Sequence, residues 1–387
     1  VVERSQSESL STDPYNRLRE RGLLQQAVDA APGDIFKGVR LGAYGEHHFN
    51  FVEGGDGNQS DIHRLVLFLG YDFADWAHLV TETEFEHGFI EDDEGGGGLV
   101  MEQFYVDLNI LPELNVRLGR ALHPAGIVNR LHEPTTFYGV ERPRYSNVIL
   151  PSTWSIDGVG LWGKLTDYLA YEVYVHSGLD GEEFRASDGI RSGRLKERPG
   201  MNDLGYSGRI DFFPLAGLED PGAVDLRLGG SYSYVGTENA NRGKGTVPGD
   251  VQILAGDMDA RLGDLELRAE GAYVWNRAAD ELANGTADEM FGWYAQAAYH
   301  VWPNAWKTGK LADSDMAVFA RYDHTHTQHS LPRGVRGDKR LDRRDITFGL
   351  SFFPVQRLVL KLDATFPTNA TGTDIPHRID AGFGYDF

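Results

Sequence analysis

The last ten residues of the chain alternate between apolar side chains and polar or small ones. Ile379, Ala381, Phe383, Tyr385 and Phe387 are apolar, and the residues between them are charged or glycine. A strand places successive side chains on opposite faces. An outer-membrane β-barrel uses this pattern because its apolar face meets lipid and its polar face meets a water-filled lumen. The segment therefore favours a barrel strand over the edge strand of a soluble sandwich.

The composition is compatible with a barrel and excludes several other classes of protein. The 387 residues have a mean hydropathy of -0.38 and contain no run of about 18 apolar residues that could form a membrane helix. The absence of cysteine excludes disulfides and thiolate chemistry. The net charge of -21 argues against a nucleic-acid partner. If the protein is exported, we expect the chain that begins at Val1 to be the mature form without its signal peptide.

The same alternation recurs from Gly38 to the end of the chain and predicts about 16 strands, an even number as in single-chain bacterial barrels. The first two cover 40–51 and 64–73, with Leu65, Leu67 and Leu69 on one face of the second. The others fall near 77–90, 99–110, 115–123, 157–164, 168–177, 204–213, 223–235, 251–262, 264–276, 290–301, 315–325, 344–353, 357–366 and 377–387.

The connections between these strands are alternately short and long. Short turns are expected near 74–75, 111–113, 166–167, 263 and 354–355, with longer ones on the same side at 214–222 and 302–314. Long loops are expected at 91–98, 124–156, 178–203, 236–249, 277–289, 326–343 and 367–376. This asymmetry is typical of periplasmic turns and extracellular loops, and an even strand count places both termini in the periplasm. We therefore predict an all-β, antiparallel transmembrane barrel over residues 38–387.

The first 37 residues form a separate N-terminal extension. Asp13 is a suitable N-cap and Pro14 a suitable first helical residue, so an amphipathic helix is expected over about 14–30, before Pro32-Gly33. The helix could lie at the periplasmic mouth, pack against a partner or enter the lumen. A partly ordered leader is the alternative.

Charged residues on the polar faces should line the lumen, because an ionised group facing lipid costs about 2–4 kcal/mol at the midplane. Most should pair across strands, and together they could set the ion preference of a pore. The predicted wall residues are Arg40, Arg64, Glu82, Glu84, Glu86, Arg117, Arg209, Arg227, Arg268 and Arg321.

The loop at 124–156 is too rich in apolar and aromatic residues to extend into water. We expect it to fold into the barrel and narrow the channel, although a cap over the rim or a surface shared between subunits would also bury it. The residues that it would present to the channel are Arg130, His132, Glu133, Glu141, Arg142 and Arg144.

In this region the sequence resembles the bacterial porins related to the phosphate-selective porins. The similar residues are Gly119-Arg120, Pro124, Gly126, His132-Glu133-Pro134, Glu141-Arg142-Pro143, Pro151-Ser152-Thr153-Trp154 and Gly158. The resemblance is firmest over residues 60–180, and it implies a trimeric, 16-stranded outer-membrane channel with an inward-folded third loop. In that family lysines and an arginine ladder confer phosphate specificity. The candidate constriction here has arginines but no lysine, so phosphate specificity is not predicted.

The function predicted from the sequence is passive diffusion of small hydrophilic, preferentially anionic solutes through a porin. The expected partners are membrane lipid, lipopolysaccharide and two further copies of the chain, which would meet near the early strands, where His47 and His63 are expected to face outward. No cofactor is expected. No nucleophile motif of the Gly-x-Ser-x-Gly type occurs, and His324 and His326 are weak candidates for a metal site. A barrel enzyme, an adhesin or a sheath for a periplasmic partner is the alternative.

Overall fold

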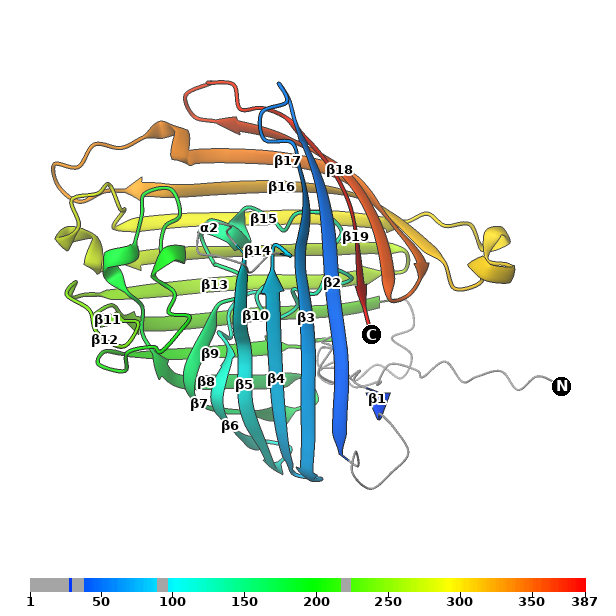
Figure 1. The fold of residues 1–387 in the computed structure, drawn as a ribbon, viewed down its shortest axis with the longest axis horizontal. Coiled ribbons are helices and arrows are strands. Elements are labelled where there is room, and N and C mark those ends of the chain that lie inside the picture. The colour runs from blue at the N-terminus through cyan, green and yellow to red at the C-terminus, as the bar shows by residue number, and fades with distance from the viewer. Residues whose placement is uncertain (1–27, 30–37, 89–96, 217–223) are drawn as a thin grey trace.

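The computed structural model describes residues 28–29, 38–88, 97–216 and 224–387. Sixteen long strands form one closed antiparallel barrel, as predicted, and a short strand, β1 (Val28–Asp29), joins the same sheet (Figure 1). The barrel strands are β2 (Val39–Val52), β3 (Gln59–Ala74), β4 (Ala77–Glu86), β5 (Gly98–Leu111), β6 (Leu114–Leu122), β7 (Ser155–Thr166), β8 (Leu169–Ser177), β9 (Leu204–Phe212), β10 (Val224–Gly236), β13 (Asp250–Leu262), β14 (Leu265–Asn276), β15 (Glu289–His300), β16 (Asp315–Ser330), β17 (Asp342–Val355), β18 (Leu358–Asn369) and β19 (Arg378–Asp386).

The barrel closes where β19 pairs with β2 in the register Ala381↔Phe49. Closure leaves no long edge whose backbone groups lack partners. β1 pairs with β2 at Val28↔Leu41, just beyond the last paired residue of β19. The predicted N-terminal helix lies mainly outside the described residues. Its expected last residues are in a strand instead, so that part of the prediction was wrong.

The two faces of the sheet differ as the period-2 pattern requires. Large apolar side chains are exposed on the outer face, including Leu67 at 45%, Phe348 at 54% and Phe387 at 58%. Polar and charged side chains point inward and are buried, and Asp380 in the last strand is fully buried. No helix among the described residues has the length and apolar character needed to span a bilayer.

A β-bulge in β3 changes the direction of one predicted outward residue. The register between β2 and β3 shifts between Glu46 and His48. Ile62 and Leu65 are both exposed, so the two residues between them face inward. His63 consequently stacks on the buried ring of His48, with ring centroids 4.4 Å apart. The prediction that His63 faces outward was wrong because one extra residue reverses the alternation.

Short turns and long loops lie at opposite ends of the barrel. The longest connection on the short-turn side joins β15 to β16 and contains η5 (Asn304–Trp306) and η6 (Gly309–Leu311). The loops at the other end carry small elements, namely η2 (Gly181–Glu183), η3 (Arg191–Gly193), the hairpin of β11 (Asn239–Ala240) and β12 (Gly243–Lys244), η4 (Arg277–Glu281) and η7 (Lys339–Leu341).

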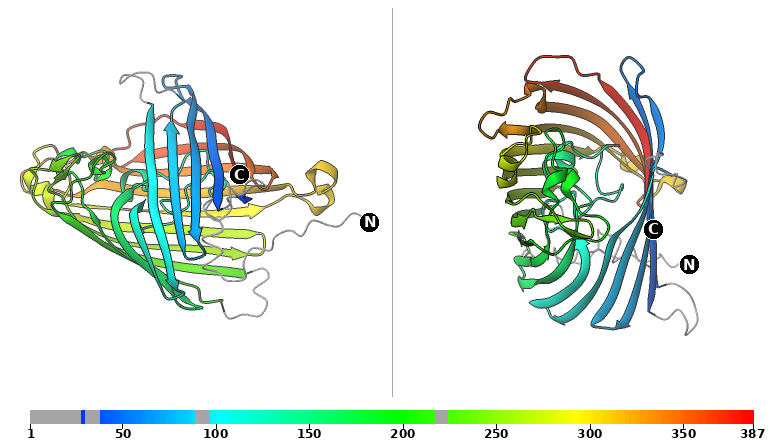
Figure 2. Two further views of the ribbon diagram at one scale, coloured as in Figure 1. Left: turned by 60° about the horizontal axis from the view of Figure 1, so that its bottom comes forward. Right: turned by 60° about the vertical axis from the view of Figure 1, so that its left-hand side comes forward.

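The loop between β6 and β7, residues 123–154, folds into the barrel, and we call it the inner loop (Figure 2). It contains the helical turn α2 (Tyr145–Val148). Tyr145, Ile149 and Leu150 of the inner loop pack in one hydrophobic cluster with wall residues such as Met290. The loop at 178–203 adds Phe184 and Ile190 to this cluster. The largest apolar core therefore lies inside the barrel, and inward folding of the loop is confirmed.

The topology can be tested with single cysteines, because the chain has none of its own. We expect an impermeant maleimide to label Ser187→Cys in a long loop on intact cells. Asp75→Cys and Gln356→Cys, which lie in short turns at exposed positions, should react only after lysis. Labelling of the short turns from outside would contradict the predicted orientation.

Candidate functional site

The inner loop is fastened to the barrel wall mainly through its own backbone. Three of its backbone N–H groups donate to wall carboxylates, and five of its carbonyls accept from wall side chains. The N–H contacts are Val128 N to Glu270 Oε1 at 3.1 Å, Val140 N to Asp363 Oδ2 at 2.6 Å and Tyr145 N to Asp323 Oδ1 at 3.5 Å. The carbonyl contacts are Lys361 Nζ to Gly139 O at 2.9 Å, Ser351 Oγ to Tyr138 O at 2.6 Å, and three from arginines, Arg64 to His132 O, Arg268 to Thr136 O and Arg321 to Glu141 O. Hydrogen bonds to ionised groups are stronger than neutral ones, so these contacts hold the loop in place.

Two glycines allow the inner loop to approach the wall closely. Gly126 has a positive φ of 72°, and a Cβ at this position would lie 2.5 Å from Oε2 of Glu270. On the opposite wall, a Cβ on Gly384 of β19 would lie 2.4 Å from Cβ of Pro134. A side chain at either position would displace the loop.

Arg130 attaches the inner loop to a buried charge network on β8, β9, β10 and β13. Its guanidinium donates to Glu172 at 2.7 Å and to Asp211 at 3.1 Å. Asp211 and Asp257 are shared by Arg209 and Arg227, and the shortest contact of each arginine measures 2.6 and 2.5 Å respectively. The side chain of Arg209 is fully buried. Arg130 is therefore an anchor for the loop, and its charge is matched by the wall.

The other predicted constriction residues separate into two groups. His132 and Glu133 are buried on the side of β4 and β5. Glu141 lies on the side of β2, where it accepts from Asn50 at 3.1 Å and lies 3.2 Å from Nδ1 of His48. The six predicted residues therefore lie along one loop but do not converge on one point.

Arg142 and Arg144 differ from Arg130 because neither lies within 4.0 Å of a carboxylate in the described part of the chain. Arg142 donates to Oγ of Ser152 at 3.0 Å and to the carbonyl of His132 at 3.2 Å. The loop at 178–203 contributes two similar arginines that the sequence analysis missed. Arg194 donates to the carbonyl of Ser152 at 2.7 Å, and Arg191 donates to that of Asn147 at 3.2 Å. These contacts join residues 42 and 44 positions apart, so no local sequence pattern indicated them. We call Arg142, Arg144, Arg191 and Arg194 the arginine cluster.

Each predicted wall arginine has an acidic partner. The pairs are Arg40–Asp72, Arg64–Glu46, Arg117–Asp107, Arg209–Asp257, Arg227–Asp211, Arg268–Asp259 and Arg321–Asp323. Of the predicted wall acids, Glu82 and Glu84 are buried and Glu86 is half-buried. The wall is thus largely neutralised by its own ion pairs.

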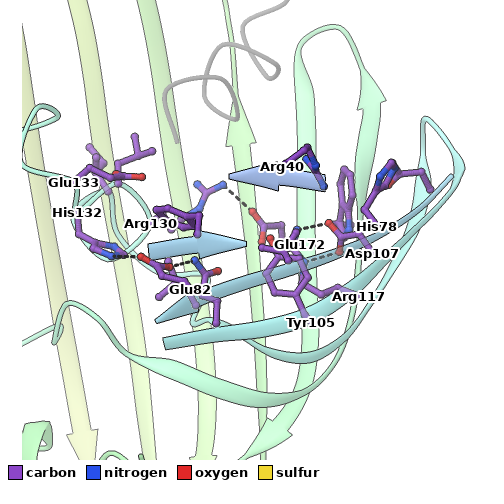
Figure 3. Close-up of a pocket in the computed structure, with 18 of the residues that line it drawn as sticks. Arg40, His78, Glu82, Tyr105, Asp107, Arg117, Arg130, His132, Glu133 and Glu172 are labelled. Carbon is purple, nitrogen blue, oxygen red and sulfur yellow. Dashed lines mark hydrogen bonds and ion pairs between the residues drawn. The ribbon is translucent and has the colours of Figure 1, made fainter. Parts of the chain in front are cut away.

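A cavity of about 250 Å³ lies between the inner loop and the wall formed by β2–β8 and β10 (Figure 3). Arg40, Asp107 and Arg117 line it on the wall, and Leu131 and His132 line it on the loop. Arg40 pairs with Asp72, next to the turn between β3 and β4, so the cavity reaches the end of the barrel with the short turns. Its charged side chains lie beside apolar ones such as Phe68 and Trp162, so the cavity offers both polar and apolar surface.

The weak metal candidates do not form a site. His324 and His326 lie within β16, which continues five residues beyond its predicted end. His324 lies 2.8 Å from Asp342, and His326 packs against Phe291. Neither belongs to a group of three converging metal ligands within the described residues.

The closed 16-stranded barrel with a loop folded into its lumen has the architecture of the outer-membrane porins. Three solved structures with this fold are the channel DcaP of Acinetobacter baumannii (TM-score 0.58, 11% identity, 93% of this chain and 100% of that chain), OmpF of Salmonella typhi (0.56, 11%, 90% and 97%) and the anion-selective porin of Comamonas acidovorans (0.52, 13%, 90% and 99%). At these identities the likeness concerns the fold. The narrower resemblance to the phosphate-selective porins stays a prediction.

A sequence relative defines the family of the chain. A protein of Aquifex aeolicus (strain VF5), described as an uncharacterized protein, is 33% identical over 346 residues, which cover 85% of this chain and 76% of that protein. The chain belongs to the same family as this Aquifex protein. No model of a known protein family matches the chain.

The buried network around Arg209 can be tested through stability. Arg209→Met should reduce the free energy of unfolding by about 3–5 kcal/mol, because it leaves one carboxylate of the network without a matching charge. The same change at Arg185, which is exposed and paired with Glu183, should cost about 0–1 kcal/mol. Urea unfolding in phospholipid vesicles, followed by tryptophan fluorescence, measures both. Equal losses in the two variants would show that the network does not stabilise the barrel.

Proposed function

We propose that the protein is an outer-membrane channel through which small hydrophilic solutes diffuse passively. The observation that carries the proposal is the combination of an apolar outer face, a charged inner face and a loop that narrows the lumen. An apolar belt around a closed sheet suits a bilayer, where unpaired backbone groups are not tolerated. A charged interior suits water and ions.

Accessible charges on both sides of the inner loop support a channel over a closed barrel. On the short-turn side, the cavity is lined by Arg40, Asp107 and Arg117. On the side of the long loops, the side chains of Arg343 and Arg378, which share the inward faces of buried Asp345 and Asp380, are 26% and 35% exposed. Water-accessible charges at both ends suit a passage for ions. The alternatives are a barrel enzyme, an adhesin or a sheath for a periplasmic partner, and each of these functions would be compatible with a closed lumen.

The arginine cluster supports a preference for anions. Its four side chains donate to backbone carbonyls or a hydroxyl or lie free of carboxylates, so their charges remain available within the described part of the chain. Burial, together with the positive charge of Arg191, lowers the pKa of Arg194 to about 9, which leaves Arg194 charged at neutral pH. Burial also lowers the pKa of Arg142, Arg144 and Arg191. An anion beside the cluster would offset this loss of solvation, and arginine binds carboxylate and phosphate groups through two parallel hydrogen bonds.

The predicted constriction residues take different roles in this proposal. Arg142 and Arg144 attract anions, Arg130 anchors the loop, and Glu141 is held by the β2 wall. The net charge of -21 acts mainly from more distant loops, where a Debye length of about 8 Å screens it at physiological salt. The barrel is proposed to lie in the outer membrane among lipid and lipopolysaccharide, with both termini periplasmic.

Recordings in planar bilayers test the channel. We expect an open pore with stable current levels, and current steps in groups of three if the assembly is a homotrimer. The double variant Gly126→Leu, Gly384→Leu is compared with the parent protein. Its new side chains should displace the inner loop and therefore change the conductance of the pore. A folded parent protein that passes no current would overturn the channel and favour a closed barrel.

Reversal potentials in a salt gradient test the anion preference. Arg144→Gln combined with Arg191→Gln should shift the reversal potential toward cations, because both changes remove charges that have no carboxylate partner among the described residues. Arg185 lies in the same loop as Arg191 but is paired with Glu183. The control variant Arg185→Gln should therefore leave the reversal potential nearly unchanged. If the double variant behaves like this control, the arginine cluster does not set the ion preference.

A further inference from the structure

Three metal-ligating side chains converge where the inner loop meets β4 and β5. Glu82 comes from β4, Glu102 from β5 and His132 from the inner loop, and their exposures are 1%, 2% and 2%. One oxygen or nitrogen of each lies within 4.8 Å of the others. Figure 3 shows His132 and Glu82 pointing toward each other beside the cavity.

Two atoms of this group are buried without a hydrogen-bond partner in the described part of the chain, Nε2 of His132 and Oε2 of Glu102. Nε2 lies 3.4 Å from that oxygen and 3.5 Å from Oε1 of Glu82. Ligands bound tetrahedrally at about 2.0–2.2 Å from a Zn²⁺ ion lie about 3.3–3.5 Å from one another. The separations in the protein are therefore those of two tetrahedral edges.

A protonated histidine satisfies the group less well than a divalent cation. Hydrogen bonds from N–H to oxygen measure about 2.7–3.2 Å, so Nε2 is too far from both carboxylates for a good one. No arginine or lysine of the described residues lies within 4.0 Å of either Glu82 or Glu102. Buried carboxylates are normally paired or bound to a metal, and one imidazolium would supply a single charge for two carboxylates.

Surrounding residues already orient the ligands. Nδ1 of His132 lies 3.1 Å from the carbonyl of Asn129. A proton on Nδ1 is donated there, which directs the lone pair of Nε2 toward the carboxylates. Tyr44 donates to Oε1 of Glu82 at 3.1 Å, and Gln103 donates to Oε2. Arg64 donates to the carbonyl of His132 at 2.5 Å and holds its backbone.

A β-bulge produces the arrangement on β5. The register between β4 and β5 shifts between Glu82 and Thr83, so that Glu102 is the extra residue. Met101 and Phe104 are exposed on the outer face, and both residues between them are buried. The bulge thus turns Glu102 and Gln103 inward together, one as a ligand and the other as the partner of Glu82. Bulges often aim side chains in this way at functional sites.

We propose that Glu82, Glu102 and His132 bind one divalent metal ion. Zn²⁺ fits best, because its preferred ligands and tetrahedral geometry match those of the three side chains. The ion would join the inner loop to the wall between β4 and β5. Imidazole and carboxylate are established zinc ligands, and three protein ligands leave one position for water. The proposal does not depend on whether the barrel conducts.

A second group of ligands must be separated from this one in any experiment. Asp61, His63 and His87 also converge. In that group Nδ1 of each histidine is near Oδ2 of Asp61, at 3.2 and 2.9 Å, and His87 is 44% exposed. Its histidine nitrogens already have a partner, so it is a rival surface site. His87→Gln removes it and provides the background for the test.

Zinc binding to the full chain in detergent, measured by competition with a chromophoric chelator, tests the proposal. In the His87→Gln background we expect one Zn²⁺ per chain. His132→Gln and Glu102→Gln should each weaken binding by about 100-fold or more, and Tyr44→Phe, which only orients Glu82, by about tenfold. His326→Gln is the matched control at the outer face and should bind zinc as its parent does.

Extended X-ray absorption fine structure, measured at the zinc edge of the His87→Gln protein, gives an independent answer if a ligand variant does not fold. One imidazole nitrogen and two carboxylate oxygens at about 2.0–2.2 Å would support the site. A zinc ion with two imidazoles would belong to another site and overturn the proposal. The proposal is also overturned if His87→Gln protein retains no zinc, or if folded His132→Gln and Glu102→Gln proteins bind it as tightly as their parent.

Discussion

The structure depends on the need to pair or hydrogen-bond the charges that the closed sheet directs inward. Alternation gives each strand an apolar outer face, so ionisable side chains can lie only in the interior, where burial of an unpaired charge is costly. Arg209 and Asp257 show the result, since both side chains are fully buried and pair across strands at 2.7 Å. The inner loop adds Arg130 to the same network. Charge matching thus links the barrel to the loop that fills it.

Most of the barrel could be predicted from the sequence, because a local period of two fixes both the strand and the direction of its side chains. Leu67 and Phe387 face outward and Asp380 faces inward, as their places in the alternation indicate. The errors arose at bulges, where one extra residue reverses the pattern without a mark in the sequence. His63 was assigned to the wrong face for this reason, and the inward position of Gln103 next to Glu102 could not be foreseen.

The inner loop was predictable only in part. Its apolar content required burial, and inward folding was expected for that reason. Its partners could not be predicted, because each contact joins residues that are distant in sequence. Glu270 accepts from Val128 across 142 positions, and Arg194 reaches Ser152 from the next long loop. The role of Arg130 as an anchor follows from two wall carboxylates, which no local motif identifies.

The carbonyl of His132 connects the two parts of the interior that carry the proposals. It accepts from Arg64, on the side of the three proposed metal ligands, and from Arg142 of the arginine cluster. Arg142 also donates to Ser152, whose own carbonyl accepts from Arg194. A metal ion that fixes the ring of His132 would therefore restrict the backbone carbonyl that holds Arg142, which in turn shares Ser152 with Arg194. A divalent cation on one side of the inner loop and anion attraction on the other would then depend on the same few residues, because one backbone carbonyl belongs to both.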